Sequence, residues 1–243
     1  MTMAHRRYGT NFRLYQSAAV LALAFLSQPA LSQPAGAAPG SAALRAAAPA
    51  KTILAFGDSL TVGYQLRPGE GFAPQLEKAL RAKGRDVTVV NAGVSGDTTA
   101  QGKARIAWGL AGAKVKPDLV ILELGANDML RGQSPAAAKA NLDAIIKDFK
   151  RRGIRVMLAG MQAQPNLGPA YVRDFNALYP AIASANKVTL YPFFMDGVAT
   201  VPGMQLADGL HPTPKGVKVI VGKMLPLVLR ELDALPKPVA GKR

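Results

Sequence analysis

The stretch ILAFGDSLTVGY, residues 53–64, decides how the rest of the chain is interpreted. Four apolar residues run into Gly57, Asp58 and Ser59, and a loop follows. This pattern is typical of a buried strand that ends at an acid and a hydroxyl. One interpretation is ordinary turn chemistry, because glycine permits positive φ and Asp and Ser bond nearby backbone amides. The other is a serine nucleophile held at the edge of a sheet, and the remaining sequence has to decide between them.

Residues 1–32 have the pattern of a secretory signal peptide. A basic start is followed by the apolar run SAAVLALAFL at residues 17–26, and PALSQ then offers small residues for cleavage. The apolar run is shorter than the about 20 residues that a membrane-spanning helix needs. We expect cleavage between Ser32 and Ala38, and therefore a periplasmic or secreted protein.

The remainder divides into a leader, one domain and a short tail. Residues 33–50 are rich in alanine and proline and cannot bury a core, so we expect a flexible leader. Residues 51–236 have the length of one domain, and the hydrophobic content of 49% is ample for a core. Residues 237–243 form a basic C-terminal tail. The chain shows neither an internal repeat nor a second domain.

The composition limits the partners. The formal charge of +15 falls to +12 when Arg6, Arg7 and Arg13 leave with the signal peptide. Lysines and arginines are scattered without a dense run, which favours a solvated basic surface over nucleic-acid binding. The chain has no cysteine, so disulfides and thiol chemistry are excluded. We expect a monomer without nucleic acid or cofactor.

Strand and helix patterns alternate after the leader. Short apolar runs, rich in β-branched residues, occur at residues 52–56, 87–91, 119–124, 155–159 and 188–191. SPAAAKANLDAIIKDFKRRG, residues 134–153, predicts a helix with one apolar stripe, and a last helix begins at Thr213-Pro214. Five such alternations predict an α/β domain with a five-stranded parallel sheet covered on both faces.

Polar residues follow the predicted strands. Ser59 follows the first strand, Gly93 the second, Asn127 the third, and DGLHPT, with Asp208 and His211, the fifth. Ligands bind outside the carboxyl ends of the strands in such sheets, so we expect these residues to share one edge.

A serine nucleophile needs a base, and His211 is the only histidine outside the signal peptide. Asp208 precedes it by three residues, so its carboxylate can orient the imidazole as in a Ser-His-Asp triad. The alternative is a plain turn before the last helix. The backbone amides of Ser59 and Gly93 and the side-chain amide of Asn127 are the candidate oxyanion donors. Asp58 and Asp128 are expected to steady their loops by hydrogen bonds.

Other hydrolase and nucleotide motifs are missing from the sequence. Neither Ser59 nor Ser95 stands in a G-x-S-x-G elbow, and no Walker A or dinucleotide motif occurs. One histidine cannot supply a zinc hydrolase site, so no metal is expected.

The blocks GDSLTVGY, NAGVSGDTTAQGKARI, LELGANDMLRG and DGLHP resemble, in order and spacing, those of the SGNH (GDSL) hydrolase family. The resemblance spans residues 51–235. It implies a flavodoxin-like three-layer α/β/α domain, with the catalytic serine at Ser59, the oxyanion residues at Gly93 and Asn127, and the rest of the triad at Asp208 and His211.

The expected function is hydrolysis of acyl esters and thioesters, in the manner of an arylesterase, thioesterase or lysophospholipase, through an acyl-enzyme on Ser59. The substrate is a small acyl ester or thioester, or a lipid at a membrane surface. Two alternatives stay open. One is a carbohydrate O-deacetylase of the same superfamily, and the other is a non-catalytic ligand-binding member.

Overall fold

The computed structural model describes residues 50–236 of the chain. The predicted signal peptide, all but the last residue of the predicted leader, and the basic tail at residues 237–243 lie outside the described residues. None of the described helices is long and apolar enough to span a membrane.

The described residues contain one parallel sheet in the order β2-β1-β3-β4-β5. The strands are β1 Lys51–Gly57, β2 Val87–Gly93, β3 Leu119–Glu123, β4 Arg155–Ala159 and β5 Thr189–Tyr191. The predicted α/β class and five-stranded parallel sheet are therefore confirmed. The strand order is that of flavodoxin-like folds.

The strands differ from the predicted ranges at their ends, and one difference matters for the site. β2 runs two residues beyond the predicted end and closes at Gly93, which pairs in register with Gly57 at the end of β1. The loop after β2 therefore begins at Val94, so Gly93 belongs to the sheet and not to the loop.

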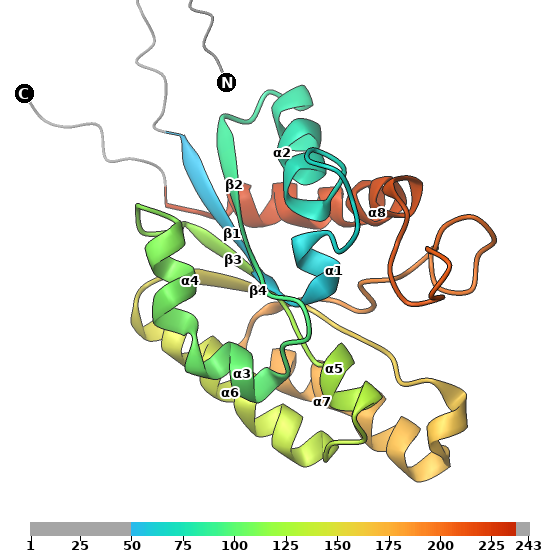
Figure 1. Ribbon diagram of the computed structural model, residues 1–243. Coiled ribbons are helices and arrows are strands. Elements are labelled where there is room, and N and C mark those ends of the chain that lie inside the picture. Colours follow the sequence, from blue (N-terminus) through green and yellow to red (C-terminus); the bar gives the residue numbers. More distant parts are fainter. Residues whose placement is uncertain (1–49, 237–243) are drawn as a thin grey trace, which may run out of the picture. The chain divides into compact units, whose positions relative to one another are not determined.

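Helices cover both faces of the sheet (Figure 1). α2 and α8 lie over one face, and α3, α4, α6 and α7 lie over the other. The long helices are α2 Phe72–Ala82, α6 Pro135–Arg151, α7 Pro169–Asn186 and α8 Pro214–Asp233. The short ones are α1 Ser59–Val62, α3 Thr99–Ala104, α4 Ile106–Gly112, α5 Ala126–Leu130 and the 3₁₀ turn η1 Pro165–Leu167.

Burial explains these elements. Residues 53–56 of β1 are fully buried, as expected for a central strand covered on both faces. On α6, Leu142, Ile145, Ile146 and Phe149 are also fully buried, so the predicted apolar stripe faces the core. Pro135 stands in the first turn of α6, where its missing N–H costs no hydrogen bond.

The strand order also locates a site. β1 is hydrogen-bonded to β2 on one side and to β3 on the other, so the order in which strands are added to the sheet reverses at β1. The loops after β1 and β3 diverge at this point and leave a crevice outside the carboxyl edge of the sheet. Ser59 begins α1, the helix that follows β1, and Asn127 lies in α5, the helix that follows β3.

Candidate active site

The turn after β1 presents Ser59. Asp58 is fully buried and caps α1, because its Oδ1 accepts a hydrogen bond from the amide of Leu60 at 3.0 Å. Ser59 is the first residue of the four-residue helix α1, which ends at Gly63 in the left-handed conformation. Asp58 therefore makes the side-chain hydrogen bond that stabilises the turn, and Ser59 is half-buried at the crevice.

His211 lies against Ser59. Its Nε2 is 2.8 Å from the Oγ of Ser59, and its Nδ1 is 2.7 Å from the Oδ2 of Asp208. An ionised Asp208 accepts the Nδ1 proton, which leaves Nε2 as the acceptor that faces the serine hydroxyl. The structure thus brings together the three residues that the sequence nominated as a triad.

Asp208 is held in its ionised form. Partial burial opposes ionisation, but the amides of His211 and Leu210 and the His211 ring donate hydrogen bonds to the carboxylate. Together these bonds lower the pKa of Asp208 to about 2. Two backbone hydrogen bonds join the ends of the loop that carries Asp208 and His211. Leu206 N donates to His211 O at 2.8 Å, and Thr213 N donates to Met204 O at 2.8 Å.

Asn127 lies in α5, beside Ser59. Its Nδ2 donates to Asp58 Oδ2 and to the carbonyl of Asp97, both at 3.1 Å. Asp128 accepts from both the amide and the hydroxyl of Thr99, at 2.8 and 2.6 Å. The prediction that Asp58 and Asp128 stabilise their loops by hydrogen bonds is therefore confirmed, and Asp58 additionally orients Asn127.

The structure does not bring Gly93 to the crevice. Its amide donates to Asn91 Oδ1 at 3.0 Å, and a Cβ there would lie 2.4 Å from the backbone nitrogen of Val62. Gly93 is required for the close packing of α1 on β2, which corrects the predicted oxyanion assignment. Gly96, in the loop after β2, lines the cavity instead, and its amide donates no hydrogen bond to another described residue.

The sequence contained a signal for this correction. NAGVSGDT holds two glycines, and the prediction takes the first, because a residue without a Cβ lets a substrate approach the backbone closely. Gly96 has φ of +83°, a conformation that glycine adopts without strain.

A buried acid pair that sequence reasoning missed lies beneath Ser59. Glu123, at the end of β3, is 1% exposed, and its Oε2 accepts from Thr61 Oγ1 at 2.8 Å. Burial raises the pKa of Glu123 to about 7. Burial and the neighbouring Glu123 carboxylate also raise the pKa of Asp58 well above its ordinary value. The signal was present in LELGAND, since a lone acid inside an apolar strand requires a buried partner.

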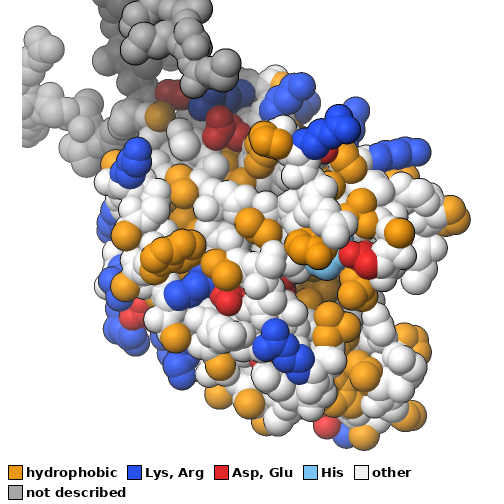
Figure 2. Space-filling model, in the orientation of Figure 1, with side chains coloured by type: hydrophobic (Ala, Val, Ile, Leu, Met, Phe, Trp, Pro, Cys, Tyr) orange, Lys and Arg blue, Asp and Glu red, His pale blue; other side chains and the backbone are white. Residues whose placement is uncertain are grey.

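A cavity of about 380 Å³ opens beside Ser59 and His211. Its walls are mostly apolar and come from the segments that follow all five strands; they include Leu60, Met129, Leu130, Met161, Phe193 and Met195. Figure 2 shows hydrophobic side chains around a hollow where the pale blue histidine lies next to an acidic side chain. Tyr64, also missed, packs on His211 with ring centres 4.5 Å apart. The cavity suits an acyl chain.

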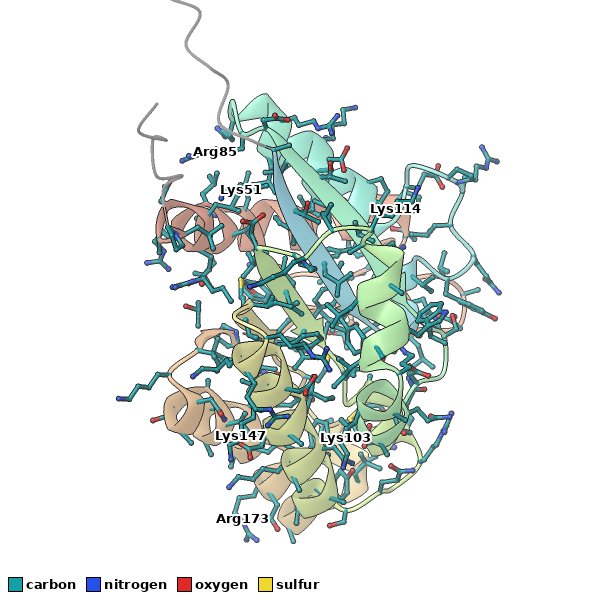
Figure 3. The ribbon with its side chains drawn as sticks, turned by 90° about the vertical axis from the view of Figure 1, so that its left-hand side faces the viewer. Lys51, Arg85, Lys103, Lys114, Lys147 and Arg173 are labelled. Atoms are coloured by element: carbon teal, nitrogen blue, oxygen red, sulfur yellow. The ribbon has the colours of Figure 1, made fainter. Side chains whose placement is uncertain are left out.

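Charged residues are spread over the surface of the described residues. Figure 3 labels six basic side chains, which come from separate elements and point outward. Four of them pair with acids: Lys51 with Asp118, Arg85 with Asp233, Lys147 with Asp143, and Arg173 with Asp174. Among residues 50–236, no cluster of three or more His, Cys, Asp or Glu side chains could hold a metal ion.

Comparison with known proteins identifies the class of this site. Residues 55–219 match the GDSL-like Lipase/Acylhydrolase family. The chain is 44% identical to esterase TesA of Pseudomonas aeruginosa over 169 residues, which are 70% of this chain and 83% of the relative. It is 41% identical to an arylesterase of Vibrio mimicus over 70% of this chain and 84% of that one. It is 37% identical to thioesterase 1/protease 1/lysophospholipase L1 of Escherichia coli K12, over 68% of this chain and 77% of that one.

Solved structures agree. The crystal structure of TesA superposes with a TM-score of 0.70 at 40% identity, covering 74% of this chain and 99% of that one. The crystal structure of AlinE4, an SGNH-hydrolase family esterase, superposes with a TM-score of 0.64 at 46% identity, covering 75% of this chain and 97% of that one. The chain therefore belongs to the GDSL (SGNH) hydrolase family, and it is an enzyme of the hydrolase class. The predicted family is confirmed.

Proposed function

We propose that the chain is an exported serine esterase that hydrolyses acyl esters and thioesters through an acyl-enzyme on Ser59. The observation that carries the proposal is the 2.8 Å distance between His211 Nε2 and Ser59 Oγ, at the mouth of an apolar cavity. The names of the relatives, esterase, arylesterase and thioesterase/lysophospholipase, support the choice of bond.

The chemistry follows from the roles of the three residues. Ser59 Oγ attacks the acyl carbonyl carbon while its proton passes to His211 Nε2. The bond to the leaving oxygen or sulfur then breaks, and the imidazolium returns the proton to the departing alcohol, phenol or thiol. Water then attacks the acyl-enzyme carbonyl while its proton passes to His211 Nε2. The bond from the acyl carbon to Ser59 Oγ breaks, and the imidazolium returns the proton to Ser59 as the acid leaves. Asp208 stabilises the imidazolium throughout.

Charge develops on the carbonyl oxygen during both steps, and the site needs donors for it. We assign this part to the amides of Ser59 and Gly96 and to the side chain of Asn127. The support is that all three residues line one cavity and that Gly96 has a free amide among the described residues.

Export is part of the proposal and rests on the sequence of residues 1–32 alone. The spread of basic residues, several of them paired with acids, favours a solvated surface and a protein that binds no nucleic acid. A monomer remains our expectation.

A substrate panel on the purified mature protein tests the proposal. p-Nitrophenyl esters from acetate to palmitate, acyl-CoA thioesters and acetylated xylan should be compared by kcat/KM. We expect turnover of the aryl esters and thioesters, because the cavity walls are apolar. A strict preference for acetylated xylan would instead support the carbohydrate deacetylase, and no turnover of any substrate would support the binding protein.

A further inference from the structure

A guanidinium lies directly behind the residues of the site. Arg105 stands between α3 and α4, and its side chain is only 14% exposed. Its Nη2 donates to the carbonyl of Gly57 at 2.8 Å, and its Nη1 donates to the carbonyl of Ala92 at 2.9 Å. Its Nε donates to the carboxylate of Asp97.

Two of these acceptors lie in the same segments as the proposed donors Ser59 and Gly96, and the third, Asp97, also contacts Asn127. Gly57 closes β1, two residues before Ser59, and Ala92 lies near the end of β2, ahead of the loop that holds Gly96. Asp97 follows Gly96 directly, and its own carbonyl accepts from Asn127 Nδ2 at 3.1 Å. One planar group therefore connects the ends of two strands with the loop that contacts the third donor.

The fork of the guanidinium is fixed by its surroundings. Its central carbon lies 4.2 Å from the centre of the buried Phe56 ring and 5.5 Å from that of Trp108. Stacking on aromatic rings and donation in several fixed directions are properties of arginine that lysine lacks. Arg105 does not line the cavity, so it would not contact a substrate bound there.

We propose that Arg105 is a positioning residue that fixes the spacing of Ser59, Gly96 and Asn127 and thereby stabilises the oxyanion without touching the substrate. This inference rests on the proposed esterase function. The donors stabilise the transition state only when they are held at the right separation before the reaction starts. A loosened guanidinium should therefore lower kcat and leave substrate binding nearly unchanged.

The test is Arg105→Lys, with Arg155→Lys as its matched control. Arg155 also pairs through Nε with a buried carboxylate, that of Glu231, but it opens β4 at the opposite edge of the sheet. We expect Arg105→Lys to lower kcat for a p-nitrophenyl ester about 10–100-fold with KM changed less than about 3-fold. Arg155→Lys should lower the melting temperature and keep kcat within about 2-fold of the wild-type value.

A second readout separates positioning from a general loss of structure. Affinity for a trifluoromethyl ketone, which forms a tetrahedral oxyanion on the serine, should fall by the same factor as kcat/KM. Affinity for the product fatty acid should not change. A folded Arg105→Lys variant with wild-type kcat would overturn the inference, and so would an equal loss of kcat in Arg155→Lys.

If Arg105→Lys does not fold, Asp97→Asn decides. That variant frees Nε from its charge partner and keeps the backbone carbonyl that bonds Asn127. We expect kcat to fall about 10-fold at constant KM, and an unchanged kcat would overturn the inference. Failure of the proposed function would look different, because the wild-type protein itself would then show no ester or thioester turnover.

Discussion

The Nε2 atom of His211 lies 2.8 Å from the Oγ atom of Ser59, although 152 positions separate the two residues in the chain. Ser59 is fixed by the cap that Asp58 places on α1, and His211 by its ring bond to Asp208 and by the pairing of its carbonyl with the amide of Leu206. Each side of the contact is thus held by local bonds. The sheet edge brings the two sides together.

Asp208→Asn should reduce kcat by about 10²–10⁴-fold. The lowered pKa of Asp208 means that its ionised form also stabilises the folded state at neutral pH, so we expect the melting temperature to fall as well. The amide cannot stabilise an imidazolium, and it can hold the ring in the wrong tautomer. Initial rates with a p-nitrophenyl ester and a thermal melt measure the two effects. Asp174→Asn, at an exposed ion pair on α7, is the control. A variant that retains more than a third of wild-type kcat would contradict the triad.

Asn127→Ala should reduce kcat about 10²–10³-fold, because one oxyanion donor is lost. Both amide protons already have acceptors, Asp58 Oδ2 and the carbonyl of Asp97, so donation to an oxyanion requires one bond to be shared. Steady-state kinetics should place the loss in kcat. A rise in KM alone would show that Asn127 binds substrate and does not stabilise the transition state.

Gly93, at the end of β2, and Gly96, in the loop after it, should respond differently to alanine. Gly93→Ala places a Cβ 2.4 Å from the backbone of Val62, so we expect a loss of at least several degrees in melting temperature. At Gly96 the nearest atom would be the far end of Arg131, at 3.6 Å. The left-handed backbone there still makes alanine unfavourable, by about 1 kcal/mol. We therefore expect Gly96→Ala to be the more stable variant and to lose activity through a displaced amide.

Melting curves and kcat for both variants check this pair. If Gly93→Ala melts like the wild type and is inactive, while Gly96→Ala is fully active, the original assignment of the oxyanion glycine to Gly93 would be restored.

Glu123→Gln should flatten the pH dependence of stability. The pKa of Glu123 is raised from 4.5 to about 7, so the folded state keeps its proton at pH values where the unfolded chain has lost it. The free energy of unfolding therefore falls as pH rises from about 4.5 to about 7. A neutral amide has no such loss, and its oxygen can still accept from Thr61.

Thermal melts at pH 5 and pH 8 measure this difference, and each kcal/mol corresponds to about 2–4 °C in a protein of this size. We expect the variant to lose less stability than the wild type over this interval. Glu77→Gln, at a partly exposed pair with Arg81, is the control and should follow the wild-type curve. Parallel curves for wild type and Glu123→Gln would contradict the buried acid.

Much of the fold could be predicted because the strands are short apolar runs that turn residues follow. The five strands and the apolar stripe of α6 needed only periodicity and burial. The end of β2 could not be placed, since the predicted strand stops at Asn91 and Gly93 is typical of a loop. Gly93 extends the strand because it alone allows α1 to approach so closely.

The residues of the site also divide into those that the sequence could predict and those that it could not. Ser59 could be nominated because it follows a strand closely, and His211 because it is the only histidine outside the predicted signal peptide. Asp208 could be nominated because it precedes His211 by three residues. Glu123, Tyr64 and Arg105 could not, because their importance lies in contacts with distant segments, such as the bonds from Arg105 to Gly57 and Ala92. Such contacts leave no short motif.

Covalent labelling of the mature protein with a fluorophosphonate tests the central claim most directly. The reagent reacts only with an activated serine, so mass spectrometry of the digest should find the adduct on Ser59. Ser59→Ala and His211→Ala should both abolish labelling, and their turnover should fall by several orders of magnitude. Labelling at another residue, or undiminished labelling of His211→Ala, would contradict the account.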